Sequence, residues 1–201
     1  EGIPVKIMKK SMAGSAESYS AYGPSWANAS NTPFREYKHF VHEGGIASPL
    51  IVHWPNSIKG KGDFRDEPSH LIDIMATCIE VSGASYPEKF NGNQIIPLEG
   101  LSLIPVFENK SLKREALYWE HDGNRAVRMG KWKLVSKAVK NNWSAWDKLD
   151  ILETDQWELF DMEKDRTELN NLSKEYPEQV KKMSLMWESW AKKTGALPRP
   201  N

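Results

Sequence analysis

The sequence predicts an α/β chain in which the closing part of a layered sheet is followed by a small antiparallel sheet of about four strands, packed by a C-terminal helix. An apolar stretch at residues 49–54 precedes an amphipathic helical pattern at residues 70–82, and this order is typical of a layered sheet. Short apolar stretches separated by turns then occupy residues 116–161, which predicts antiparallel hairpins. A longer amphipathic pattern at residues 175–194 predicts the covering helix.

The N-terminal part contains few regular elements. Residues 1–20 carry Gly, Ser and Ala with little periodicity, which predicts a loop or mobile segment. Residues 34–41 predict an irregular or extended segment that leads to a turn at Gly44-Gly45. The strand at residues 49–54 follows, and Pro55 ends it.

The helix at residues 70–82 has recognisable signals at both ends. Ser69 is expected to cap its N-terminus, and Gly83 provides the stop. Its apolar residues form a broad face that we expect to be buried, with Cys78 as a buried thiol within it.

After residue 83 the chain becomes rich in loops. Residues 84–112 contain three prolines, with one short helix expected within residues 100–108. We divide the chain into residues 1–112, the end of the α/β part, and residues 113–201, the small sheet with its helix. The strands of this sheet are expected at residues 116–121, 125–129, 132–136 and 157–161. Imperfect alternation along the third strand predicts a sheet with one covered face.

Composition limits the possible partners. Lys and Arg together number 27, as do Asp and Glu, so the formal net charge is zero. No global field favours nucleic acid, and any recognition of an anion must be local. No apolar run is long enough to span a bilayer. A single cysteine, Cys78, excludes a disulfide framework or a cysteine metal cluster within the chain.

Candidate site residues gather just before the strand at residues 49–54. Lys38 offers a compact positive charge suited to a sulfate or phosphate oxygen, although its pattern alone also fits an ordinary exposed lysine. His42, His39 and Trp26 are weaker substrate-binding candidates, and both histidines also suit structural roles. The two histidines have no third ligand at a recognised metal spacing, so we expect no metal site here. Glu43 is expected to accept hydrogen bonds from turn amides.

Several catalytic motifs are missing from this sequence. It contains no Gly-rich phosphate loop, no G-x-S-x-G elbow, no zinc motif and no Asp-rich calcium cluster. If the chain contributes to catalysis, we therefore expect the nucleophile and the metal ligands to lie elsewhere.

Five segments, in this order, resemble the C-terminal part of the arylsulfatase family, within the alkaline-phosphatase-like superfamily. They read TPFREYKHFVHEGGIASPLIVHWP, SHLIDIMATCIEVSGA, LEGLSLIPVF, ALYWEHDGNRAVRMGKWKLV and WELFDMEKDRTELNNLSKEYPEQV. The resemblance extends over nearly the whole chain from Tyr22 onward, and the shared order makes coincidence improbable.

The resemblance implies the C-terminal portion of an alkaline-phosphatase-like enzyme that hydrolyses sulfate esters. It places Lys38, in YKHFVHEGG, at the family lysine that holds a sulfate oxygen. The family also uses a formylglycine made within C/S-x-P-x-R and a calcium ion held by Asp and Asn. This sequence lacks those motifs, so we expect no cofactor within the chain, both groups in the full-length enzyme, and no activity for the chain alone.

The remaining expectations concern partners and location. The implied substrate is a sulfated small molecule or glycan, and the implied compartment is secreted, periplasmic or lysosomal. The alternatives are a noncatalytic carbohydrate- or protein-binding module that uses Trp143 and Trp146, or a phosphatase or phosphodiesterase of the same superfamily. An unpaired strand edge at residues 50–54 predicts self-association of the isolated chain.

Overall fold

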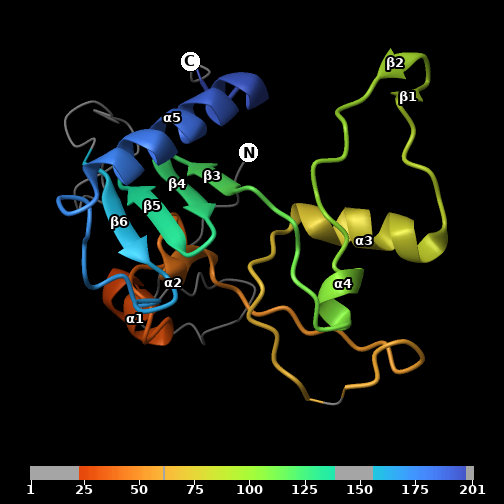
Figure 1. The fold of residues 1–201 in the computed structure, drawn as a ribbon, viewed down its shortest axis with the longest axis horizontal. Helices are drawn as coiled ribbons and strands as arrows, with labels where there is room; N and C mark the ends of the chain where they lie inside the picture. Colours follow the sequence, from red (N-terminus) through yellow and green to blue (C-terminus); the bar gives the residue numbers. More distant parts are fainter. Residues whose placement is uncertain (1–22, 61, 139–155, 198–201) are drawn as a thin grey trace, which may run out of the picture. The chain divides into compact units, whose positions relative to one another are not determined.

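A computed structural model describes residues 23–60, 62–138 and 156–197 of the chain (Figure 1). The described residues form two compact units, one drawn from residues 23–48, 118–138 and 156–197 and the other from the described residues of Pro49–Leu117. The second unit ends at Leu117, and the division expected at residue 112 stays a prediction. Residues 23–48, however, group with the C-terminal sheet rather than with residues 49–112.

The first unit is built on a four-stranded antiparallel sheet, visible in green and cyan in Figure 1. The strands are adjacent in chain order, and each begins within one residue of its expected position, which confirms the prediction. They are β3 (Leu117–His121), β4 (Asn124–Met129), β5 (Trp132–Ser136) and β6 (Glu158–Asp161).

Tight turns join the first three strands. Asp122 and Gly123, which alone separate β3 from β4, both have positive φ, 49° and 83°. This is the geometry of a type I′ turn, whose twist matches that of the strands it joins. Gly130, with φ of 55°, begins the equally short connection between β4 and β5.

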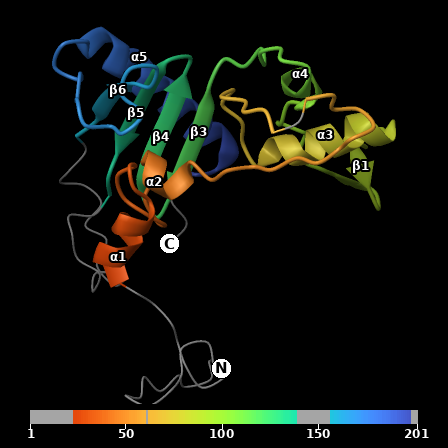
Figure 2. The same ribbon diagram turned by 90° about the horizontal axis from the view of Figure 1, so that it is seen from below.

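Both faces of this sheet are covered, which corrects the expectation of one covered face. Ala126 of β4 lies opposite Val135 of β5, and both pack with Phe160 of β6 against Val41. The opposite face lies under α5 (Pro177–Thr194), as Figures 1 and 2 show. Sequence alternation failed here because successive β5 residues are buried on both sides of the sheet.

Helix α5 covers the sheet through one stripe of its surface. Met183, Trp187 and Ala191 are buried along it, four residues apart and therefore on one face. The indole nitrogen of Trp187 donates a hydrogen bond to the carbonyl oxygen of Trp119 at 2.9 Å. Gly195 ends the helix in the left-handed region, as the sequence predicted.

Residues 23–48 add two short helices to the same unit, α1 (Gly23–Ser30) and α2 (Glu43–Ile46). The turn expected at Gly44-Gly45 is therefore a single helical turn. A Cβ atom on Gly44 would lie 2.2 Å from the carbonyl oxygen of Arg35, and one on Gly45 would lie 2.0 Å from that of Phe40. Glycine is required because the backbone of the preceding loop packs directly against α2.

The second unit contains two helices and a small hairpin. They are α3 (Ile72–Ser82), α4 (Ile104–Phe107), β1 (Lys89–Phe90) and β2 (Asn93–Gln94). Gly83 ends α3 as expected. The strand expected at residues 49–54 is not formed: neither described sheet includes it, and Ile51 is 91% exposed. A strand needs a hydrogen-bonded neighbour, which the described residues do not supply to it.

Two expectations about α3 were wrong. Ser69 does not cap the helix; the carboxylate of Asp73 instead accepts a hydrogen bond from the amide of His70 at 2.7 Å. Cys78 is exposed rather than buried. The buried residues of α3 are Asp73 and Ala76, and Asp73 also binds the Arg114 guanidinium at 2.5 Å and the Leu101 amide at 2.9 Å.

The apolar side of α3 consequently faces away from its own unit. The exposed large apolar side chains of this unit include those of Leu50, Ile51, Leu71 and Met75. These side chains lie in the strand-edge and helix segments whose exposure was expected to drive self-association. Self-association itself stays a prediction. Among the described residues, no helix combines the length and the apolar character needed to cross a membrane.

Candidate functional site

Lys38 is exposed in a tight turn at the edge of the first unit. The Phe40 amide donates to the Tyr37 carbonyl oxygen at 3.1 Å, and His39 at the third turn position has φ of 89°. This is the pattern of a type II turn, which usually places glycine at that position. A positive φ at a residue other than glycine costs on the order of 1–3 kcal/mol, so surrounding contacts must hold the turn.

Those contacts come from the β3–β4 hairpin. The buried side chain of Asn124 donates to the His39 carbonyl oxygen and to the His121 carbonyl oxygen, both at 3.0 Å. Its own side-chain oxygen accepts from the Ala138 amide at 3.2 Å. One amide side chain therefore fixes the Lys38 turn to the hairpin, and sequence reasoning missed it. An Asn directly after an Asp-Gly turn was the available signal.

The segment on the C-terminal side of the turn is held by a buried ionic cluster. The ammonium group of Lys133, which has no exposed surface, lies 2.7 Å from a Glu43 oxygen and 2.8 Å from a Glu168 oxygen. Glu168 also accepts from the Glu43 amide at 2.9 Å. Glu43 thus neutralises a buried lysine, and the expectation that its carboxylate accepts from turn amides was wrong.

His42 is also buried, with no exposed surface, and its Nε2 lies 3.1 Å from a carboxylate oxygen of Glu158. The Arg35 guanidinium lies 3.6 Å from the same oxygen and donates to the Glu168 carbonyl oxygen at 2.6 Å. These contacts fasten both ends of residues 35–42 to the sheet unit. They favour the structural role for His42 over direct contact with a substrate.

The His42–Glu158 contact predicts a pH-dependent stability. The hydrogen bond from His42 lowers the pKa of Glu158, burial opposes that effect, and the positive charges of Arg35 and Lys137 reinforce it. A carboxyl group whose pKa is lowered by folding contributes stability above its unfolded value of about 4.3, and this contribution is lost as pH falls through the lowered pKa. Between about pH 5 and pH 3, urea unfolding should therefore show a larger loss of stability for the wild type than for Glu158→Gln. Equal losses in the two proteins would contradict the prediction, and exposed Glu175→Gln serves as the control.

The other candidate residues occupy different surroundings. His39 is partly buried beside the hairpin, where its Nδ1 lies 3.6 Å from Asp122. Trp26 lies on α1 with 69% of its surface exposed. The structure therefore places His39 next to Lys38 at the hairpin and separates both from the buried position of His42. Trp143 and Trp146 lie outside the described residues.

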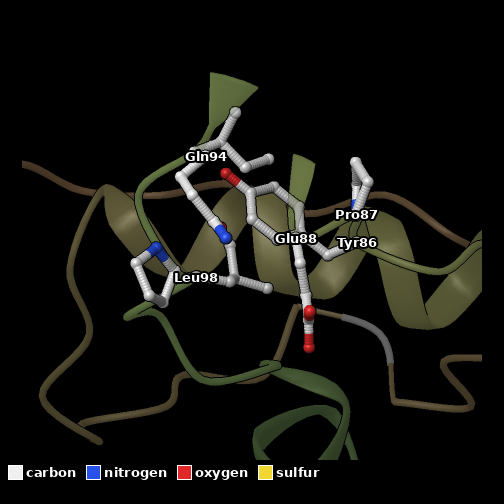
Figure 3. Close-up of a pocket in the computed structure, with 7 residues that line it drawn as sticks. Tyr86, Pro87, Glu88, Gln94 and Leu98 are labelled. Atoms are coloured by element: carbon white, nitrogen blue, oxygen red, sulfur yellow. The ribbon is translucent and has the colours of Figure 1, made fainter. Parts of the chain in front are cut away.

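A hollow of about 320 Å³ lies in the second unit (Figure 3). Its lining residues are Tyr86, Pro87, Glu88, Gln94, Ile95, Pro97 and Leu98. None of them carries a positive charge, and Glu88 adds a negative one. The hollow therefore does not suit a sulfate or phosphate group.

The described residues do not fit the two groups that the family resemblance implies. The one described cluster of three potential metal-binding side chains joins His39, His121 and Asp122. Calcium prefers six to eight oxygen ligands, so two imidazoles and one carboxylate do not suit it. Cys78 lies in TCIEV, without the Pro and Arg that formylglycine formation requires by resemblance. Neither group is assigned to this chain.

The fold and the segment around Lys38 can now be compared with known proteins. The family model described as N-sulphoglucosamine sulphohydrolase, C-terminal, matches residues 35–193. The chain belongs to this sulfatase family. The match begins at Arg35 and runs through both segments of the sheet unit, so the turn that carries Lys38 is part of the family domain.

Curated relatives agree with this assignment. An uncharacterized sulfatase of Schizosaccharomyces pombe is 30% identical over 98% of this chain and 35% of its own length. An arylsulfatase of Clostridium perfringens is 32% identical over 71% of this chain and 27% of its own length. The chain thus spans about a third of the length of these relatives.

A solved structure shares the fold. The crystal structure of Ps i-CgsB in complex with k-i-k-neocarrahexaose has a TM-score of 0.60 at 25% identity, and the match covers 80% of this chain and 32% of that one. This solved structure therefore shares the mixed α/β fold of a chain that the family model assigns to the sulfatases.

Proposed function

We propose that the full-length protein containing this chain hydrolyses sulfate esters and that Lys38 contacts a sulfate oxygen. The observation that carries this proposal is that Lys38 is exposed on a turn held in place by surrounding contacts. By resemblance, it stands at the position of the family lysine. The two histidines that follow Lys38, His39 and His42, are partly or fully buried beside a carboxylate, whereas Lys38 is exposed. Its placement suits a group that meets a ligand.

The chemistry of Lys38 follows from its charge. An ammonium group beside the sulfuryl oxygens would orient the ester and stabilise the negative charge that develops as the S–O bond breaks. Calcium and formylglycine, when supplied by the full-length protein, would provide a Lewis acid and the nucleophile. Residues 35–43 act by holding the lysine in place, since a misplaced donor gives little stabilisation.

The substrate is proposed as a sulfated small molecule or glycan. A glycan is the first class to test, because the matched Ps i-CgsB structure is titled as a complex with a neocarrahexaose. The secreted, periplasmic or lysosomal compartment implied by the resemblance is part of the same proposal. The 201-residue chain alone is expected to be inactive, since it contains no C/S-x-P-x-R segment.

The test is replacement of Lys38 by Ala in the full-length protein. The kcat/KM for 4-nitrophenyl sulfate should fall by about 10²–10³, the usual loss for one oxyanion donor. Lys59→Ala, which removes an exposed lysine from the other unit, is the control and should have little effect. An unchanged kcat/KM for Lys38→Ala would sink the assigned role, and faster turnover of the aryl phosphate than of the sulfate would favour the phosphatase alternative.

A further inference from the structure

The side chains of His39, His121 and Asp122 converge where the Lys38 turn meets the β3–β4 hairpin. One potential ligand atom from each lies within 4.8 Å of the other two. Asp122 Oδ2 is 3.6 Å from His39 Nδ1 and 3.5 Å from His121 Nε2. We infer that these three side chains form a binding site for a borderline divalent transition-metal ion such as Zn²⁺.

The separations suit a small ion. Zinc binds imidazole nitrogen and carboxylate oxygen at about 2.0–2.2 Å, so neighbouring ligands of a tetrahedral site lie roughly 3.3–3.6 Å apart. The two distances from Asp122 already fall in or near this range. The imidazole rings are nearly parallel, 15° apart, with centroids 5.6 Å apart. A metal ion lies in the plane of each imidazole that binds it, so the ring of His121, whose side chain is half exposed, must turn out of this parallel arrangement before both rings bind one ion.

The backbone around the cluster is fixed without a metal ion. Buried Asn124 binds the carbonyl oxygens of both His39 and His121 at 3.0 Å. The type I′ turn holds Asp122 at φ of 49°, and the Gly123 amide donates to Glu120 at 2.8 Å. The backbones of three ligand residues from two segments distant in sequence are therefore held together by contacts that leave the ligand side chains available. Such preorganisation lowers the entropic cost of binding.

The donor set selects the kind of ion. Two imidazoles and one carboxylate suit Zn²⁺, Cu²⁺, Ni²⁺ or Fe²⁺, whereas Ca²⁺ and Mg²⁺ require more oxygen ligands. Three protein ligands leave further positions for water or for a ligand oxygen. An ion here would connect the residue after Lys38 to the hairpin and would thereby hold the Lys38 turn more rigidly.

The experiment is a Zn²⁺ titration of the 201-residue chain by isothermal calorimetry, in a Cys78→Ser background that removes the exposed thiol. We expect one ion per chain and a rise in Tm with Zn²⁺ concentration. His121→Ala and Asp122→Asn should each weaken binding by more than about 10-fold. His53→Ala, which removes an exposed histidine outside the cluster, should leave the affinity unchanged.

The controls separate this site from other histidines and from calcium. Titration with Ca²⁺ in place of Zn²⁺ should give the same heat for the wild type and for His121→Ala. Absence of Zn²⁺ binding, or equal affinity for wild type and His121→Ala, would overturn the inference. Loss of binding in His53→Ala would also overturn it. Circular dichroism of each variant confirms that the fold is retained, and His39→Ala provides a second, independent ligand deletion.

Discussion

Replacing Lys133 by Met is expected to lower the free energy of unfolding of the sheet unit by about 3–5 kcal/mol. Lys133 has no exposed surface and is the ammonium partner of both Glu43 and Glu168. Its removal leaves two buried carboxylates close together without their shared ammonium group, and the Arg166 guanidinium, 4.0 Å from Glu43, offsets this charge in part. Breaking a buried ion pair from one side is costly because the remaining charge stays desolvated.

The measurement is urea unfolding of the 201-residue chain followed by tryptophan fluorescence and far-UV circular dichroism. Lys131→Met is the matched control, since this lysine lies two residues away, binds Asp161 at 3.0 Å and has 39% of its side chain exposed. Its loss should cost much less stability than the loss of Lys133, because the Lys131 side chain is partly exposed to solvent. Similar losses for Lys133→Met and Lys131→Met would show that the buried cluster does not stabilise the fold.

A compensating variant separates charge from packing. Lys133→Met combined with Glu43→Gln and Glu168→Gln removes all three charges and should recover part of the lost stability. The repulsion between the two carboxylates is then removed, and the side-chain amides of the introduced glutamines can still accept hydrogen bonds. Failure of the triple variant to recover stability would locate the effect in the packing of the Lys133 side chain rather than in its charge.

Local signals in the sequence sufficed for the tight turns of the sheet and for the end of α5. Asp122-Gly123 and Gly130 specify tight hairpins through their positive φ, and Gly195 specifies the end of α5. These features depend only on neighbouring residues, so they could be read without a structure. The exposed position of Lys38 was likewise consistent with its local pattern.

Features that depend on distant residues could not be predicted from local patterns. Lys133 stands between apolar strand residues, and its burial follows from Glu43 and Glu168, which lie 90 residues before it and 35 after it in the chain. The inverted orientation of α3 likewise follows from Asp73 binding Arg114. Long-range ion pairs overrode the hydrophobic pattern at both places, and nothing in the periodicity indicates which carboxylate a lysine will meet.

Trp187→Ala should destabilise the same unit by about 3–5 kcal/mol, the usual cost of deleting a large buried aromatic side chain. Trp187 is 2% exposed between α5 and the sheet. Its indole donates to the Trp119 carbonyl oxygen at 2.9 Å, and the Arg125 guanidinium lies 5.1 Å from its ring. The truncation therefore removes apolar burial, one hydrogen bond and a cation–π contact together.

Trp187→Phe distinguishes these contributions. Phenylalanine keeps most of the buried apolar area but cannot donate a hydrogen bond to Trp119. Because of the apolar area that it retains, its expected loss of unfolding free energy is about 1–2 kcal/mol smaller than that of alanine. Urea unfolding of the two variants by far-UV circular dichroism measures the difference. If phenylalanine costs as much as alanine, the hydrogen bond to Trp119 dominates the attachment of α5. If both substitutions cost under about 1 kcal/mol, packing of α5 does not stabilise the sheet, and the sheet face under α5 is not part of the hydrophobic core.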